Sequence, residues 1–473
     1  MVQIFRMILF GSIVMSSLAK ADQFHYQNFL IGDRAIGLGG AYSGVADDAS
    51  GIFYNPAGTA FALNNDVSGS ANAIYQKKIV FKNTLPGHDF TENSNGTVPS
   101  FFGGLLKADS VAEGLVIAWG IYSLDSELKD QDDLFTEVDL GANAPCQSGA
   151  ATPPNNVLNR FHRTVNSRGA TEYYGLALGW RLANNMSIGL GANYIQVNEL
   201  VQEYQDVKQA SHFCKTDGGF EPGSLRLTQN IRQKLTAYGV QPVLGIQVSL
   251  FGRLSLGLTF KAGSWLSQKF EQTAEIRKVK MLESDQANVE ALSETQSLPV
   301  LASPSVIGVF QNKGNKTPES NPLGSMAPSI RLGLAWFAST RLLITSDVAH
   351  TMAVTDAEKF GGFDYGLYSK EAVTNLMLGM EYYLTPAVPV RLGVFTNNDA
   401  TPEIDTKKAN QRNHVDYLGG TFFLAWVQPN SQIGAGIVLQ DGKGKAQKIG
   451  GVTTVQDVEA RSFTFAFSAT TTL

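Results

Sequence analysis

Four charged residues are the first candidates for chemistry in this chain of 473 residues: Arg331, Asp347, Glu381 and Arg391. They fall on two expected β-hairpins, and each couple is placed symmetrically about its turn, so its members should lie nearly opposite each other. Two roles stay open. The couples can form salt bridges inside the fold, or the two arginines can offer a cationic site to a carboxylate headgroup, because arginine binds carboxylate through two hydrogen bonds.

Aromatic residues accompany this charged group. Those expected to face the same interior could line an apolar path, and they are Phe337, Phe395, Tyr417 and Phe423. Near the beginning of the chain, DQFHYQNF (22–29) carries Phe24 and Phe29 and is apolar enough to touch a buried ligand. Together these residues suggest binding of a lipophile.

Signals of catalysis are weak. No GxSxG nucleophile elbow is present, because the GAYSG run at 40–44 has the wrong spacing. The six histidines are scattered and form no HExxH or other ligand pair. We therefore expect no enzyme activity, no catalytic residue, no cofactor and no metal site.

The elements that must position these side chains are β-strands. From Asp66 onward the sequence repeatedly alternates apolar and polar residues with period two, as in LSLGLTFK (254–261). The expected strands are 66–82, 97–107, 113–124, 169–182, 185–206, 229–250, 253–276, 326–337, 341–352, 371–384, 388–398, 414–427, 431–442 and 458–471.

The connections between these strands alternate in length. Tight turns are expected at 108–112, 183–184, 251–252, 338–340, 385–387 and 428–430. Long polar loops are expected at 83–96, 125–168, 207–228, 277–325, 353–370, 399–413 and 443–457. Short turns on one rim and long loops on the other are typical of an outer-membrane barrel, so the fold class is an all-β transmembrane antiparallel barrel of about fourteen strands.

The faces of the strands support this barrel against a soluble sandwich. Trp180, Trp336, Tyr382 and Trp426 all lie within a few residues of a short turn, where an interfacial aromatic girdle belongs. The inward faces hold many glycines, which either leave space inside or ease the curvature of the sheet.

A glycine-rich segment precedes the strands: GDRAIGLGGAYSGVADDASGIFYNPAGTAF (32–61). Asp47 and Asp48 are expected to cap a short helix over 49–54, which Pro56 ends. An ordinary glycine-rich loop is the alternative to a segment packed inside the barrel. A dinucleotide loop is excluded because Tyr42 occupies the position of its last glycine.

The run GLGGAYSGVADDASGIFYNPAG resembles the N-terminal hatch of the FadL/TodX family of outer-membrane channels for long-chain fatty acids and other hydrophobic compounds. The resemblance implies a fourteen-stranded barrel (66–473) stoppered by a hatch (22–65) whose motif residues are Gly39, Gly40, Asn55, Pro56 and Ala57. It also implies passive uptake: a hydrophobic substrate is captured by the extracellular loops, held in the lumen, and released after a hatch shift through an opening at a kink in the third strand. Gly114 and Gly120 lie in that strand.

Residues 1–21 have the order of a secretory signal, with Arg6, an apolar run over 7–15, and Ala-Lys-Ala at 19–21. Removing Arg6 and Lys20 with this leader changes the formal net charge from −5 to −7. A nucleic-acid partner is therefore not expected. The chain is expected in the outer membrane as a monomer surrounded by lipid.

The two cysteines, Cys146 and Cys214, are expected to form a disulfide, because an exported chain meets an oxidising environment. Apolar residues at mixed helical spacing in 277–325 suggest a helix over the pore. The alternative function is a closed barrel that acts through its loops as an adhesin-like surface protein. The chain ends in Leu473 and not in the terminal aromatic residue usual for such barrels.

Overall fold

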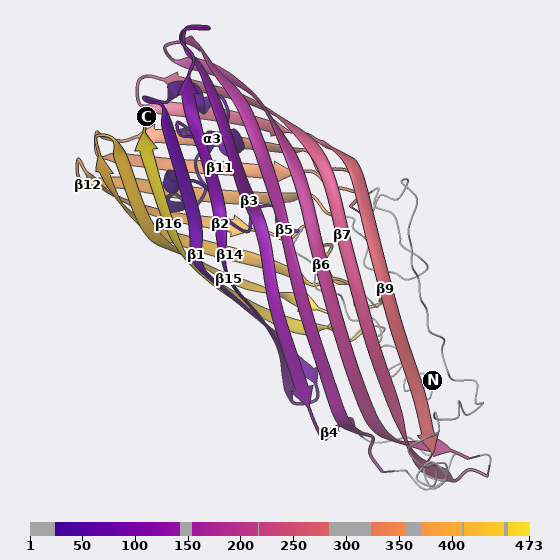
Figure 1. Ribbon diagram of the computed structural model, residues 1–473. Helices are drawn as coiled ribbons and strands as arrows, with labels where there is room; N and C mark the ends of the chain where they lie inside the picture. The colour runs from indigo at the N-terminus through magenta and orange to yellow at the C-terminus, as the bar shows by residue number, and fades with distance from the viewer. Residues whose placement is uncertain are drawn as a thin grey trace.

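One antiparallel β-sheet closes on itself and accounts for most of the described part of the chain (Figure 1). The computed structural model describes residues 24–141, 154–215, 217–282, 323–355, 370–408, 411–448 and 453–473. The sheet order runs from β3 through β2, β1 and β16 down to β5, and β3 also pairs with β5, which completes the barrel. The expected leader (1–21) and Cys146 lie outside the described residues.

The strands alternate inward and outward side chains along their length. Their bounds are β1 Asp66–Leu85, β2 His88–Lys107, β3 Leu115–Phe135, β4 Val138–Asp139, β5 Val157–Ala183, β6 Met186–Cys214, β7 Phe220–Leu250, β8 Leu254–Lys261, β9 Ser264–Leu282, β10 Ser329–Phe337, β11 Leu342–Thr351, β12 Val373–Thr385, β13 Val388–Asn397, β14 His414–Gln428, β15 Ser431–Ala446 and β16 Gln456–Thr472. Strands β8 and β9 both pair with β7, one after the other, and β4 has only two residues. The wall therefore has fourteen positions, which confirms the prediction from the sequence.

The N-terminal segment lies in the interior of the barrel (Figure 1). It contains the helices α2 (Asp33–Gly37) and α3 (Gly51–Tyr54) and the 3-10 helix η2 (Gly58–Phe61). The expected helix over 49–54 is present in part, but its capping was predicted wrongly. Asp48 accepts hydrogen bonds from the backbone N–H and the hydroxyl of Ser50 at 2.8 and 2.5 Å, and no side chain caps α3.

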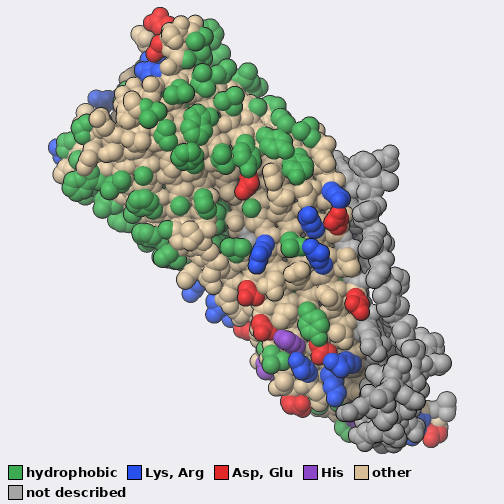
Figure 2. Space-filling model, viewed as in Figure 1, with side chains coloured by type: hydrophobic (Ala, Val, Ile, Leu, Met, Phe, Trp, Pro, Cys, Tyr) green, Lys and Arg blue, Asp and Glu red, His purple; other side chains and the backbone are tan. Residues whose placement is uncertain are grey.

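A belt of apolar side chains covers the outer surface at the end of the barrel that carries the short turns (Figure 2). Outward Leu176, Leu332 and Leu378 are each more than half exposed in the isolated chain, and comparable residues occupy almost every strand. The four expected girdle residues Trp180, Trp336, Tyr382 and Trp426 are between 40 and 56 % exposed beside the short turns. So much contiguous apolar surface fits a hydrocarbon environment. None of the helices in the described part of the chain is long and apolar enough to cross a membrane.

The opposite end of the wall is taller than the sequence indicated. The loop expected at 83–96 is wrong, because β1 and β2 continue and meet in a tight hairpin between Leu85 and His88. Similarly, β3 continues to Phe135, and β6 and β7 pair out to Cys214 and Phe220. Residues 277–282 belong to β9 and are not helical, while 283–322 lie outside the described residues.

These extensions have a core of their own. Phe81, Phe90, Phe161, Val207 and Leu227 are among its buried members. Buried ion pairs lie nearby: Glu92 contacts both Lys129 and Lys448, and Arg163 Nε donates to Glu203 Oε1 at 2.8 Å. The extended end is thus a packed structure that positions the mouth of the barrel.

Candidate functional site

The inner face of the wall has repeated glycines because the N-terminal segment packs directly against it. A Cβ on Gly333 would lie 2.6 Å from Gly44 N, and one on Gly189 would lie 2.8 Å from Ala57 Cα. Gly39 adopts φ +62°, which favours glycine, and packs against the backbone of Gly393. The sequence left two explanations open for the inward glycines, space inside the barrel and curvature of the sheet. These positions favour space, because glycine there lets two backbones approach closely.

The Asn-Pro-Ala motif makes the matching polar contacts. Asn55 Nδ2 donates to Ser43 O at 3.0 Å and to Ile246 O, on the wall strand β7, at 3.1 Å. Its Oδ1 accepts from Ala57 N at 3.1 Å, and Ser187 Oγ on β6 donates to Ala57 O at 2.7 Å. Asn55 is fully buried, so these bonds satisfy polar atoms that would otherwise be costly to remove from water.

Ion pairs tie the same segment to the other side of the wall. Arg391 on β13 donates from Nη1 to Asp33 at 2.9 Å and from Nε to Glu381 on β12 at 2.7 Å. Arg34 donates to Glu381 at 2.8 Å and to Asp47 at 3.1 Å. Arg391, Glu381 and Asp33 are each at least nine-tenths buried. The expected couple Glu381 and Arg391 is thus present, and it holds the N-terminal segment.

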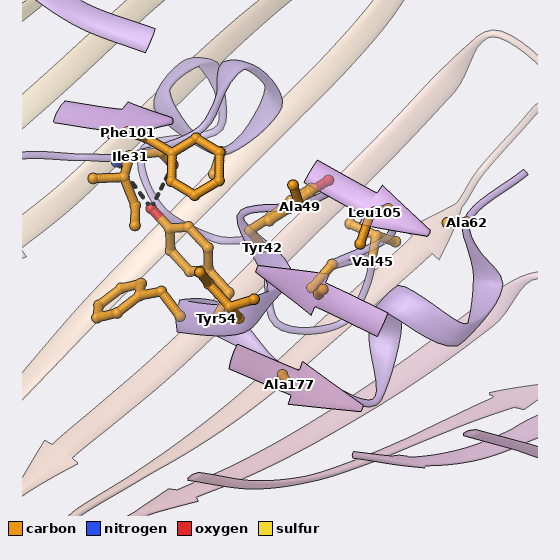
Figure 3. Close-up of a cluster of buried hydrophobic side chains, with 14 of the residues drawn as sticks. Ile31, Tyr42, Val45, Ala49, Tyr54, Ala62, Phe101, Leu105 and Ala177 are labelled. Carbon is orange, nitrogen blue, oxygen red and sulfur yellow. Dashed lines mark hydrogen bonds between the residues drawn. The ribbon is translucent and has the colours of Figure 1, made fainter. Parts of the chain in front are cut away.

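Inside the segment, two tyrosines organise the buried cluster shown in Figure 3. The Tyr54 hydroxyl donates to Ile31 O at 3.2 Å and accepts from Ile31 N at 3.4 Å. Tyr42 meets Tyr54 edge to face at 5.5 Å between ring centroids. Leu105 and Ala177, from the wall strands β2 and β5, belong to the same cluster. The cluster therefore joins the segment and the wall in one core.

A cavity of about 180 Å³ lies between the N-terminal segment and the wall. Its apolar lining includes Leu30, Phe53, Leu124, Tyr173, Ile195, Val197, Trp265, Leu323, Met326, Met377 and Phe395. Gln27 and His25 from the N-terminal segment also border it. Apolar atoms make up most of the exposed lining, so a lipophilic molecule would find apolar contacts over much of the cavity.

Three cationic side chains border this cavity, and they differ in their partners. Lys370 Nζ lies over the rings of Phe24 and Tyr26, at 5.4 and 5.3 Å from their centroids. Arg331 already has partners for its guanidinium. Its Nε donates to Asp347 at 2.7 Å, and its terminal nitrogens donate to Gln27 and to the carbonyl of Gly40. Lys261 is 8 % exposed, and its Nζ lies 3.5 Å from the ring centroid of Phe53. No carboxylate pairs with Lys261 within the described ranges, and the neighbouring charge that acts on it is the positive Arg331. Lys261 is therefore the group whose charge a bound anion would balance.

The wall is interrupted beside the cavity. Strands β2 and β3 pair from Lys107↔Val116 to Phe101↔Tyr122 and again at Ser94↔Lys129, with no pair between. At this place β3 is irregular between Ser123 and Asp125, and its Leu124 carbonyl accepts from the backbone N–H of Phe29 at 3.0 Å.

Phe29 fills the interior side of this interruption. It packs edge to face on Tyr75 at 5.0 Å, and Val98 completes the buried cluster. Asn28 Nδ2 adds a hydrogen bond to Asp125 Oδ1 at 3.0 Å. The third strand thus departs from regular pairing near the level where the N-terminal segment meets it.

Comparison with known proteins agrees with this arrangement. No protein-family model matches the sequence, and no curated protein matches it. Among solved structures, a Pseudomonas aeruginosa FadL homologue superposes with a TM-score of 0.57 at 13% identity, covering 95% of this chain and 99% of that one. The toluene transporter TodX of P. putida gives a TM-score of 0.50 at 12% identity, with coverages of 94% and 98%. The chain has the FadL-type barrel fold.

Within this FadL-type fold, the residues expected to bind ligand fall at three kinds of place. Arg331 and Phe395 border the cavity. Phe24, Phe29, Phe423 and Arg391 are buried in contacts between the N-terminal segment and the wall. Phe337 is 40 % exposed at the end of β10 and does not border the cavity.

Sequence reasoning missed Lys261, Trp265 and Met326. Lys261 ends the clearest alternating run, on the face of Ser255, Gly257 and Thr259, so the inward cation was there to be found. Trp265 is the second residue of β9, beside an irregularity in the pairing of β9 with β7, and Met326 precedes β10, so periodicity gives no direction at either position.

The expected disulfide is described at one end only. Cys214 is disulfide-bonded and Cys146 lies outside the described residues. No group of His, Cys, Asp and Glu suited to a metal ion occurs within the described ranges.

Proposed function

We propose that the protein is an outer-membrane channel for the uptake of hydrophobic molecules that carry an anionic headgroup, such as long-chain fatty acids. The observation that carries the proposal is an apolar cavity that contains Lys261, a buried cation without a carboxylate partner among the described residues. A carboxylate placed there would gain a charge-assisted hydrogen bond in a site shielded from water. Tyr173, Trp265 and Met326 would contact the chain of the ligand.

The N-terminal segment is proposed to act as the hatch. Its residues 25–27 and Leu30 border the cavity, and Phe29 closes the interior side of the gap between β2 and β3. A ligand that displaces Gln27 and Leu30 would disturb the neighbouring Phe29 and its bond to Leu124. Movement of this short stretch is then sufficient to join the cavity to the gap, while α2 and α3 stay held by their ion pairs and close backbone packing.

The headgroup assignment is tested by Lys261→Met. The uptake of a labelled long-chain fatty acid and of its methyl ester is measured in cells that express the full chain. Loss of a hydrogen bond to a charged group costs about 1.5–3 kcal/mol, so the affinity for the acid should fall about tenfold or more while that for the ester is unchanged. Lys107→Met, at the exposed end of β2, is the control for loss of a positive charge.

Two results would contradict the proposal. If cells with the wild-type chain take up no more acid or ester than cells without it, the channel function is wrong, and an adhesin-like surface role becomes the better hypothesis. If Lys261→Met affects acid and ester equally, the cavity does not select an anionic headgroup. Deletion of residues 22–29 tests gating separately and should impair growth on a hydrophobic carbon source.

A further inference from the structure

A basic and apolar row crosses the outer face of the tall side of the barrel. Leu128 on β3 pairs with Arg168 on β5, Arg168 with Leu200 on β6, and Leu200 with Lys234 on β7. These four side chains border a shallow groove of about 380 Å³ whose lining also includes the small residues Ser126, Gly169 and Ala170. Figure 2 shows Lys and Arg side chains gathered on this face just beyond the apolar belt.

The row lies at the height of lipid headgroups. A strand crosses the hydrocarbon layer in about ten residues. Counted from the exposed Leu182 near the short turn, this places the outer edge of the layer near Glu172, just beyond the exposed Tyr174. Arg168 is four residues farther along β5, which is about 13 Å along the strand and about 9 Å along the membrane normal at a 45° tilt.

The charges in the row lack fixed partners. Arg168, Lys234 and the adjacent outward Arg232 have no salt bridge within the described ranges. The acid next to them on β9, Glu271, is paired with Lys269 at 2.5 Å, although its charge is also felt by Lys234 and Arg232. A patch of net positive charge beside the exposed Leu128 and the partly exposed Leu200 matches a ligand that has both phosphate groups and acyl chains.

We propose that this row (Leu128, Arg168, Leu200 and Lys234) is a binding site for a phosphorylated lipid of the outer leaflet. Arg168 would bind a phosphate through two hydrogen bonds and Lys234 would act as a second positive charge. Leu128 and Leu200 would contact the apolar part of the lipid. The site rests on the proposed outer-membrane location, and it is separate from the lumenal cavity.

The test titrates the detergent-solubilised full chain with lipid A, a doubly phosphorylated acylated disaccharide, and counts bound lipid by native mass spectrometry. The double variant Arg168→Gln/Lys234→Gln should bind about tenfold more weakly or worse. The matched control is Arg160→Gln/Lys208→Gln, which removes two cations from a neighbouring pair of the same sheet, eight positions farther out on β5. It should bind like the wild type.

The second arm of the test uses the same lipid without its phosphates. This lipid should bind the wild type and both double variants more weakly than lipid A binds the wild type. Equal weakening by the two double variants, or equal binding of the dephosphorylated lipid to the wild type, would overturn the site. Because the titration is done in detergent, its outcome does not depend on transport. Fatty-acid uptake by cells that express the same variants tests the channel function separately from lipid binding.

Discussion

Arg391→Met should destabilise the folded protein strongly, because Arg391 holds the N-terminal segment to the wall. Its guanidinium pairs with Asp33 at 2.9 Å and with Glu381 at 2.7 Å, and all three side chains are at least 94 % buried. Removing one partner of a buried ion pair leaves an uncompensated charge and costs about 3–5 kcal/mol. Methionine has a similar length, so the cavity term is small.

Arg461→Met is the matched control. Arg461 also pairs with an aspartate at 2.9 Å, but its side chain is 85 % and that of Asp441 is 73 % exposed. Such a surface pair is worth about 0.2–1 kcal/mol. The assay is urea unfolding in phospholipid vesicles, followed by tryptophan fluorescence. The reasoning is refuted if the two variants lose equal free energies of unfolding, because Asp33 would then not be held in the lumen by a buried charge.

Two further outcomes are expected from the same assay. Gly333→Ala should cost about 1–3 kcal/mol, because its Cβ would lie 2.6 Å from Gly44 N. Gly420→Ala meets only an atom at 3.8 Å and should be nearly neutral. Similar costs for both would contradict the packing of the N-terminal segment on β10. Burial lowers the pKa of Lys448, which follows β15 at the extended end, to about 7, against an ordinary value of 10.5. Between these values the unfolded chain binds more protons, so stability should rise with pH from about 7 to 10.5. Lys448→Met should flatten this rise, and an unchanged slope would contradict the assignment.

Much of the wall follows from the sequence, because the hydrocarbon layer imposes a simple rule. Inside the layer every outward residue must be apolar, so strands such as Leu254–Lys261 alternate clearly and their short turns are easy to place. Glu381 and Arg391 could be paired by counting from their turn, and the structure pairs them.

The extended ends of the strands could not be predicted from the sequence, because the rule that outward residues are apolar applies only inside the hydrocarbon layer. Beyond Glu172 the outward residues of β5 are polar except for Ala170, and several inward ones, including Arg163 and Ser167, are polar as well. The apolar alternation is therefore diluted, and a paired strand has the composition of a loop. In β3, Gln131 and Asp133 are likewise polar residues at buried, inward positions.

The candidate site was found only in part for a different reason. Some inward aromatic residues border the cavity and others pack against the N-terminal segment, and a single sequence does not separate the two groups. Phe395 borders the cavity, but Phe423 is buried in the cluster that contains Ile36 of the N-terminal segment. The cavity also depends on Met326 and Leu323, which precede β10 and have no periodic signal.

The central claim is that a lipophile occupies the lumen beside the hatch. Its most direct test is photo-crosslinking of the purified full chain with a diazirine-labelled long-chain fatty acid, followed by peptide mapping, with unlabelled acid as competitor. The account predicts competed labelling at Tyr173, Trp265 and Met326, which border the cavity. Labelling confined to outward belt residues such as Leu176 and Leu378, with none in the cavity, would contradict it.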